Sequence, residues 1–90
     1  MILVTVKHRD GSEAKAQVWA STEIAFERKF KLAWSEAFST EHTFQEYVYF
    51  TAWYALTEEG KCSLDFDSWV KTIETVGVEA PDENPLPQAP

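Results

Sequence analysis

The stretch Tyr47-Val48-Tyr49-Phe50-Thr51-Ala52-Trp53-Tyr54-Ala55-Leu56 runs for ten residues without a charged side chain. It lies within residues 44–59, which follow a capping-box pattern made by Thr43 and Glu46 and precede Gly60, a common helix stop. At about 100° per residue, the apolar side chains of this segment surround the helix axis almost completely. The sequence therefore predicts a helix over residues 44–59 that the rest of the chain packs around. This helix is too short to span a bilayer, which needs roughly 20 apolar residues.

The first 18 residues alternate as a β-hairpin does, with a turn signal at Asp10-Gly11. A two-residue turn would pair Val6 with Lys15. A three-residue loop with Gly11 in the left-handed conformation pairs Val6 with Ala14 instead. The second register gathers the small apolar side chains on one face: Ile2, Val4, Val6, Ala14, Ala16 and Val18. Because strand register follows the hydrophobic pattern, we predict the three-residue loop and expect this face to pack on helices.

Two more helices are predicted on either side of the central one. Apolar residues recur at helical spacing over residues 22–38, and the short polar connection at residues 39–42 predicts that this helix is antiparallel to the central helix. A third apolar stripe covers residues 66–76, with Asp65 as its N-cap and Gly77 as its stop. The chain is therefore expected to contain three helices after the hairpin.

Residues 79–90 hold all four prolines, three carboxylates and one large apolar side chain. Such a segment buries too little apolar surface to order itself. The predicted fold class is α+β, with an N-terminal β-hairpin packed on a three-helix bundle in the order ββααα. We expect a single domain over residues 1–77, followed by a disordered, acidic and proline-rich tail over residues 78–90.

The net charge of −7 is spread unevenly along the chain. Residues 1–40 carry six basic and five acidic side chains, which gives +1, whereas residues 41–90 carry two basic and ten acidic ones, which gives −8. The basic surface that nucleic-acid binding requires is therefore missing. The acidity is explained either by solubility or by a basic partner, including mimicry of nucleic acid. The single cysteine excludes an internal disulfide and fits a reducing compartment, so we expect a cytosolic protein.

No arrangement of residues in the sequence predicts catalysis. His8, His42 and Cys62 lack the paired spacing of a zinc site, although a spatial pairing of Cys62 with either histidine stays open. There is no phosphate-binding glycine loop and no supported Ser/His/Asp grouping. Four glutamates are expected on solvated faces: Glu23, Glu27, Glu58 and Glu59. We therefore predict a protein that is not an enzyme and that uses no metal or cofactor.

Four segments make the chain resemble a known family: Ala25-Phe26-Glu27-Arg28-Lys29-Phe30, then Tyr49-Phe50-Thr51-Ala52-Trp53-Tyr54-Ala55-Leu56 with Gly60, then Leu64-Asp65-Phe66-Asp67-Ser68-Trp69-Val70, and the end Asn84-Pro85-Leu86-Pro87-Gln88-Ala89-Pro90. With these segments the chain resembles the small tail assembly chaperones of long-tailed phages, in particular those that infect actinobacteria. The likeness covers roughly residues 24–76 and the character of the tail. The resemblance rests on the positions of aromatic residues and of helix ends.

The resemblance implies a role without catalysis, in the host cell cytoplasm. Such chaperones bind the tape measure protein, a very long and largely helical chain, and keep it soluble while tail tube subunits assemble around it. Many are made in two forms, of which the longer arises by a programmed frameshift, and the proline-rich end is compatible with the short form. The implied partners are the tape measure protein and tail tube subunits, with self-association left open and neither nucleic acid nor membrane expected.

The alternative function is that of an acidic, phage-encoded inhibitor that mimics nucleic acid on a host protein, which the −8 charge of residues 41–90 motivates. On the chaperone hypothesis, the client or a second copy lays an amphipathic helix into an apolar groove. The candidate partner-binding residues are the apolar side chains that fall outside the predicted core stripes: Leu3, Trp19, Leu32, Phe38 and Tyr49.

Overall fold

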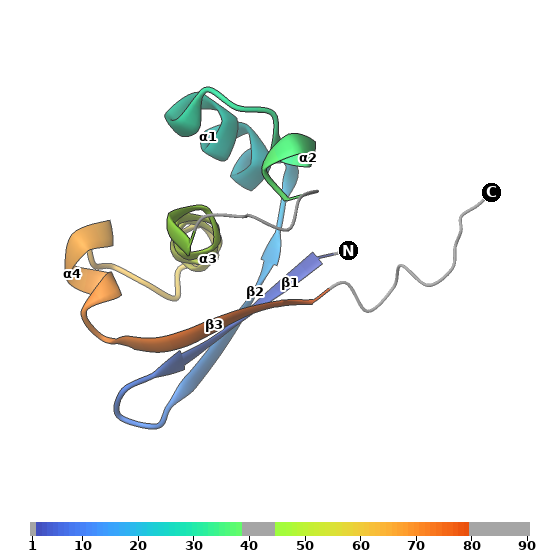
Figure 1. The fold of residues 1–90 in the computed structure, drawn as a ribbon. Coiled ribbons are helices and arrows are strands. Elements are labelled where there is room, and N and C mark those ends of the chain that lie inside the picture. Colours follow the sequence, from blue (N-terminus) through green and yellow to red (C-terminus); the bar gives the residue numbers. More distant parts are fainter. Residues whose placement is uncertain (1, 39–44, 80–90) are drawn as a thin grey trace.

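The computed structural model describes residues 2–38 and 45–79 as a three-stranded antiparallel sheet packed against helices. In chain order the elements are β1 (Ile2–His8), β2 (Glu13–Val18), α1 (Ala20–Phe30), α2 (Trp34–Ala37), α3 (Gln45–Glu58), α4 (Phe66–Val70) and β3 (Ile73–Glu79). The helices all lie over one face of the sheet, with α3 between the sheet and the outer pair α1 and α2 (Figure 1). The predicted α+β class is confirmed.

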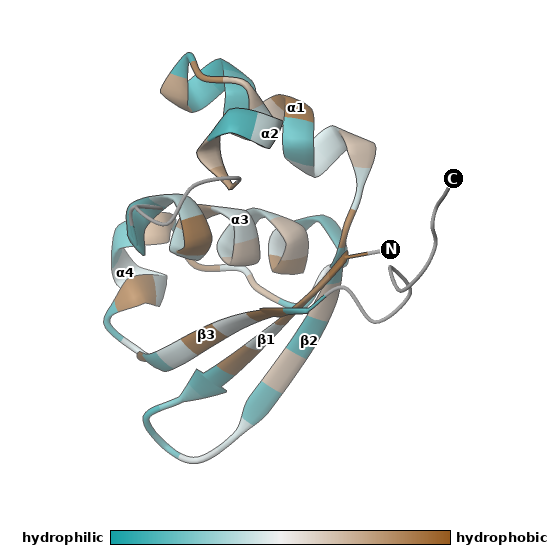
Figure 2. Ribbon diagram, turned by 45° about the vertical axis from the view of Figure 1, so that its right-hand side comes forward, coloured by the Kyte–Doolittle hydropathy of each residue, from teal (hydrophilic) through white to brown (hydrophobic). Residues whose placement is uncertain are grey.

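The hairpin forms in the predicted register. Val6 lies opposite Ala14, Val4 opposite Ala16 and Ile2 opposite Val18. The loop is closed by the His8 N–H, which donates to the carbonyl of Ser12 at 2.8 Å, and Gly11 takes a φ of +94°. Only glycine adopts such a φ without a steric penalty, which explains the three-residue loop. Apolar and polar positions alternate along β2 (Figure 2). The buried hairpin residues Val4, Val6, Ala16 and Val18 pack with residues of α3.

The last element differs from the prediction. The third predicted helix, over residues 66–76, is the shorter α4, which ends at Val70. Residues 73–79 form the strand β3, which pairs with β1 and places Val76 opposite Val6 and Val78 opposite Val4. The order ββααα and the three-helix bundle are therefore wrong: residues 2–38 and 45–79 follow the order ββααααβ, and β3 pairs with the other edge of β1. The strand also extends to Glu79, past the predicted domain end at residue 77. Residues 80–90 of the predicted tail lie outside the described residues.

The predicted helix over residues 22–38 is two helices. α1 ends at Phe30, and Lys31 takes the left-handed conformation with a φ of 56°. The side chain of Glu27 then folds back and accepts the backbone N–H of Trp34 at 2.8 Å, at the first residue of α2. Glu27 is exposed, as predicted for a solvated face, and its carboxylate also forms this hydrogen bond within the fold. It satisfies one of the donors that a helix start leaves unpaired.

α3 is the central helix that its sequence predicts, with apolar neighbours on opposite sides. Its end at Gly60 is confirmed: Gly60 has a φ of +76°, and the Lys61 N–H donates to the carbonyl of Leu56 at 2.8 Å, as in a Schellman motif. Thr43, the predicted start of the capping box, lies outside the described residues. The side toward the sheet belongs to what we call the sheet cluster: Val4, Val6, Ala16, Val18, Ala52, Ala55, Leu56, Trp69 and Ile73.

Candidate functional site

A second cluster lies on the side of α3 that faces away from the sheet. We call it the aromatic cluster, and it consists of buried Phe26, Ala37 and Phe50 with the partly buried side chains of Phe30, Leu32, Trp34, Phe38, Tyr47, Trp53, Tyr54 and Phe66. Phe26 is fully buried at its centre. Its ring centroid lies 4.7 Å from that of Phe30 and 5.5 Å from that of Phe38. Most of these rings are tilted or edge-on to one another, the arrangement that aromatic quadrupoles prefer.

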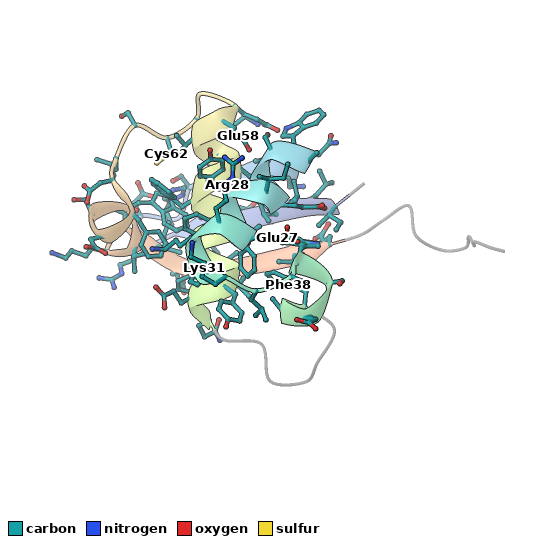
Figure 3. The ribbon with its side chains drawn as sticks, turned by 90° about the horizontal axis from the view of Figure 1, so that it is seen from above. Glu27, Arg28, Lys31, Phe38, Glu58 and Cys62 are labelled. Carbon is teal, nitrogen blue, oxygen red and sulfur yellow. The ribbon has the colours of Figure 1, made fainter. Side chains whose placement is uncertain are left out.

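The cover over this cluster is thin. α1 is a helix of 11 residues and α2 is a single turn of 4 residues, whereas α3 has 14 residues. Seen from above, α1 crosses over α3, and Phe38 follows α2 (Figure 3). The ammonium of Lys29 lies 5.5 Å from the ring centroid of Phe30 and 5.7 Å from that of Phe50, which extends the cluster to a charged rim. The result is a set of rings that the outer helices bury only in part.

The structure distributes the five predicted partner-binding residues over several surfaces. Leu32 and Phe38 lie together in the aromatic cluster. Tyr49 instead packs against the sheet cluster, below α3. Leu3 neighbours Val4 in the strand and therefore points to the opposite, helix-free face of the sheet. Trp19 is 47% exposed at the start of α1. Their role in binding stays a prediction, and the five do not form one continuous patch.

The carboxylates at the end of α3 have a role that the sequence interpretation missed. Glu58 accepts the hydroxyls of Ser21 and Thr22, and so ties α3 to the first turn of α1. Glu58 is exposed, as predicted for a solvated face, whereas Glu59 is partly buried. Their position just before the Gly60 turn is the signal that was available, because a helix end held at a fixed geometry can direct its side chains at neighbouring elements.

Glu59 closes part of the free edge of β2. Its Oε2 accepts the backbone N–H of Gln17 at 2.9 Å and the indole N–H of Trp19 at 3.2 Å. The hydrogen bond from Gln17, assisted by the ion pair with Lys61 at 3.0 Å, lowers the pKa of the Glu59 carboxyl below its ordinary value of 4.5. Lys61 in turn donates to the carbonyl of Lys15 at 2.6 Å. Two side chains thus occupy backbone groups that a further strand would otherwise use.

A pocket of about 330 Å³ opens beside the hairpin loop and the segment between α3 and α4. His8 and Cys62 are both among the residues that line it. The thiol of Cys62 donates only a long contact of 3.8 Å to the carbonyl of Leu64. Across residues 2–38 and 45–79, no three His, Cys, Asp or Glu side chains are grouped so that they could hold a metal ion.

The comparisons with known proteins give no relative. No protein-family model, no curated protein and no solved structure matches the chain. In the part of the chain that is described, no helix has both the length and the apolar character needed to cross a membrane. The fold is a small α+β domain in which α3 separates the sheet cluster from a partly buried aromatic cluster.

Proposed function

We propose that this protein is a phage tail assembly chaperone that binds the tape measure protein and keeps it soluble while the tail tube assembles. The proposal rests on the resemblance of residues 24–76 to that family and on one structural observation. That observation is the aromatic cluster, whose outer rings stay partly exposed beneath the short helices α1 and α2.

An aromatic surface of this kind suits a helical client. A helical chain with an apolar stripe buries that stripe by docking in an apolar groove, and the anchoring side chains are mostly aromatic. Leu32 and Phe38 lie at the edge of the aromatic cluster, next to Trp34, whose ring centroid is 4.3 Å from that of Phe38. We assign the client contact to these two residues first.

Charge supports the same function. A protein that holds an apolar client in solution needs enough net charge to prevent association of the complexes, and this chain carries −7. The alternative, an acidic mimic of nucleic acid, has weaker support. It requires carboxylates spaced along one surface, whereas Glu27, Glu58 and Glu59 form hydrogen bonds within the fold.

Co-expression with the tape measure protein of the encoding phage tests the proposal. The protein should raise the soluble fraction of the tape measure protein and co-purify with it. Leu32→Ser combined with Phe38→Ser should abolish both effects, while the circular dichroism spectrum stays that of a folded protein. Ile24→Ser is the matched control, because Ile24 also lies on the outer layer and is 47% exposed but is outside both clusters.

Two outcomes would contradict the proposal. In the first, the wild-type protein neither changes the solubility of the tape measure protein nor co-purifies with it. In the second, the double variant is folded and still holds the client in solution, which would remove the aromatic cluster as the binding surface. Binding to a basic DNA-handling protein that weakens steeply with salt would favour the nucleic-acid mimic instead.

A further inference from the structure

The two edge strands of the sheet, β2 and β3, differ in whether their outward backbone groups are hydrogen-bonded. On β2, the outward backbone groups of Lys15 and Gln17 are bound by Lys61 and Glu59. In an antiparallel pair, the backbone groups of successive residues point alternately to one side and the other. Because the odd-numbered residues of β2 point outward, its even-numbered residues form the hydrogen bonds to β1. The odd-numbered residues of β1 then form the hydrogen bonds to β3. β3 pairs Gly77 with Thr5 and Thr75 with Lys7, so its own even positions face the open edge.

The open edge of β3 carries two valines, of which Val76 is partly buried and Val78 is exposed. Among the described residues, no group bonds to the outward N–H and C=O of Val76 and Val78. Val78 is 45% exposed, although it lies opposite the fully buried Val4 on the helix-covered side of the sheet. An edge strand whose outward backbone groups are unpaired, and which carries an exposed valine, is a template for pairing with another strand. Figures 1 and 2 show β3 forming this edge of the sheet.

We propose that a second copy of the chain pairs its β3 with this edge, antiparallel, about a two-fold axis at Gly77. In that register Val76 lies opposite Val78 of the partner subunit, and Val78 lies opposite the partner's Val76. The apolar row that runs through Ala14, Val6 and Val76 then continues into the partner's Val78, Val4 and Ala16. The dimer thereby joins two three-stranded sheets into one sheet of six strands.

The charged and apolar residues of β3 and its neighbours favour the pairing about Gly77 with a second copy of the chain. On the helix-free face, Thr75 comes to lie opposite Glu79 of the partner subunit. Lys7, the neighbour of Thr75 on β1, already lies opposite Glu13 on β2, and the partner's Glu79 becomes a second acidic residue on the same face, one strand further away. A two-fold axis at Val76 would instead place Val78 against the partner's Glu74 and break the valine pairs. Gly77 at the axis has no Cβ, and open space surrounds the position where one would be.

Cysteine cross-linking tests the register directly. In a Cys62→Ser background, Gly77→Cys places two thiols opposite each other at a pair that is not hydrogen-bonded, with Cα atoms about 4.5 Å apart. Mild oxidation should give a disulfide-linked dimer in high yield. Thr75→Cys is the matched control, because its counterpart lies about 13 Å away along the strands and cannot be bridged. Equal cross-linking of the two variants, or none of Gly77→Cys, would overturn the proposal.

Sedimentation equilibrium of the full chain supplies the second test. The wild-type protein should form dimers as its concentration rises from micromolar to millimolar. Val78→Lys should raise the dissociation constant by about tenfold or more, because it places an ammonium against the partner's valine. Ile24→Lys changes an equally exposed apolar residue away from the edge and should leave the dimer unchanged. A monomer at all concentrations, or a folded Val78→Lys variant that dimerises like the wild type, would refute the β3 interface.

Discussion

The carboxylate of Glu59 accepts the backbone N–H of Gln17 at 2.9 Å, across a sequence separation of 42 residues. The contact fixes the end of α3 against the free edge of β2. Because the carboxylate also accepts the indole N–H of Trp19 and pairs with Lys61, one side chain holds together the strand, the start of α1 and the segment after α3.

Glu59→Gln should therefore destabilise the protein at neutral pH by about 1 kcal/mol, equivalent to a melting temperature lower by roughly 4–8 °C. The amide resembles the protonated carboxyl, which binds these donors less well. The lowered pKa of Glu59 means that its contribution is present above 4.5 and is lost as the pH falls through the lower value of the folded state.

Thermal melts between pH 3 and pH 7 check the direction of this pH dependence of stability. The difference between wild type and Glu59→Gln should be largest above a pH of about 5 and should shrink below the ordinary carboxyl pKa of 4.5. A difference that is constant across this range would mean that ionisation of Glu59 plays no part in holding the edge.

Phe26→Ala should cost about 3–5 kcal/mol, because the side chain is fully buried among the rings of the aromatic cluster. The loss should appear in urea melts together with a weaker near-ultraviolet circular dichroism signal from the surrounding aromatic residues. Phe26→Leu keeps most of the volume and should cost less than half as much. Equal costs for both variants would point to a specific aromatic requirement instead of a cavity.

Lys31→Gly should stabilise the protein by about 0.5–1 kcal/mol, because glycine adopts the left-handed conformation at the end of α1 without a Cβ clash. Arg28→Gly is the control within the same helix and should destabilise by about 1 kcal/mol. Denaturant titration of both variants measures the effect. Destabilisation by Lys31→Gly would show that the lysine side chain contributes more than its backbone strain costs.

Trp53→Ala should cost about 2–4 kcal/mol, since Trp53 is partly buried and contacts both clusters. Its indole N–H also donates to the carbonyl of Leu64 at 2.9 Å. Trp53→Phe keeps much of the packing but loses this hydrogen bond, so a loss of about 1 kcal/mol is expected in the same urea melts. A loss below about 1 kcal/mol for Trp53→Ala would contradict the central role of α3.

Residues close together in the sequence were sufficient to predict the hairpin and α3. The strict alternation around Asp10-Gly11 admits one register that places all small apolar residues on one face, and Gly60 ends α3 by its left-handed φ. The end of the chain was ambiguous. Val70, Ile73 and Val76 fit a helical stripe as well as a strand, and the abundance of β-branched residues over 73–79 was the signal that favoured the strand.

Contacts distant in sequence explain the other differences. No glycine or proline marks the break at Lys31, which is stabilised by the carboxylate of Glu27 on the Trp34 N–H. For the candidate site, helical spacing identified most of the aromatic residues, but it could not assign Tyr49 to the sheet side and Phe38 to the outer side. That assignment depends on how α1 and α2 pack over α3.

The middle position of β1 has a consequence for how quickly the domain forms. β1 precedes and β3 follows every other described element, and their pairing brings Leu3 to Glu79. Closing so long a loop costs chain entropy before any of the pairing is gained, so we expect the hairpin and α3 to associate early and β3 to be added in the slow step. Until then the second edge of β1 is bare. During synthesis the nascent chain therefore presents one unpaired edge of the central strand until residues 73–79 have left the ribosome.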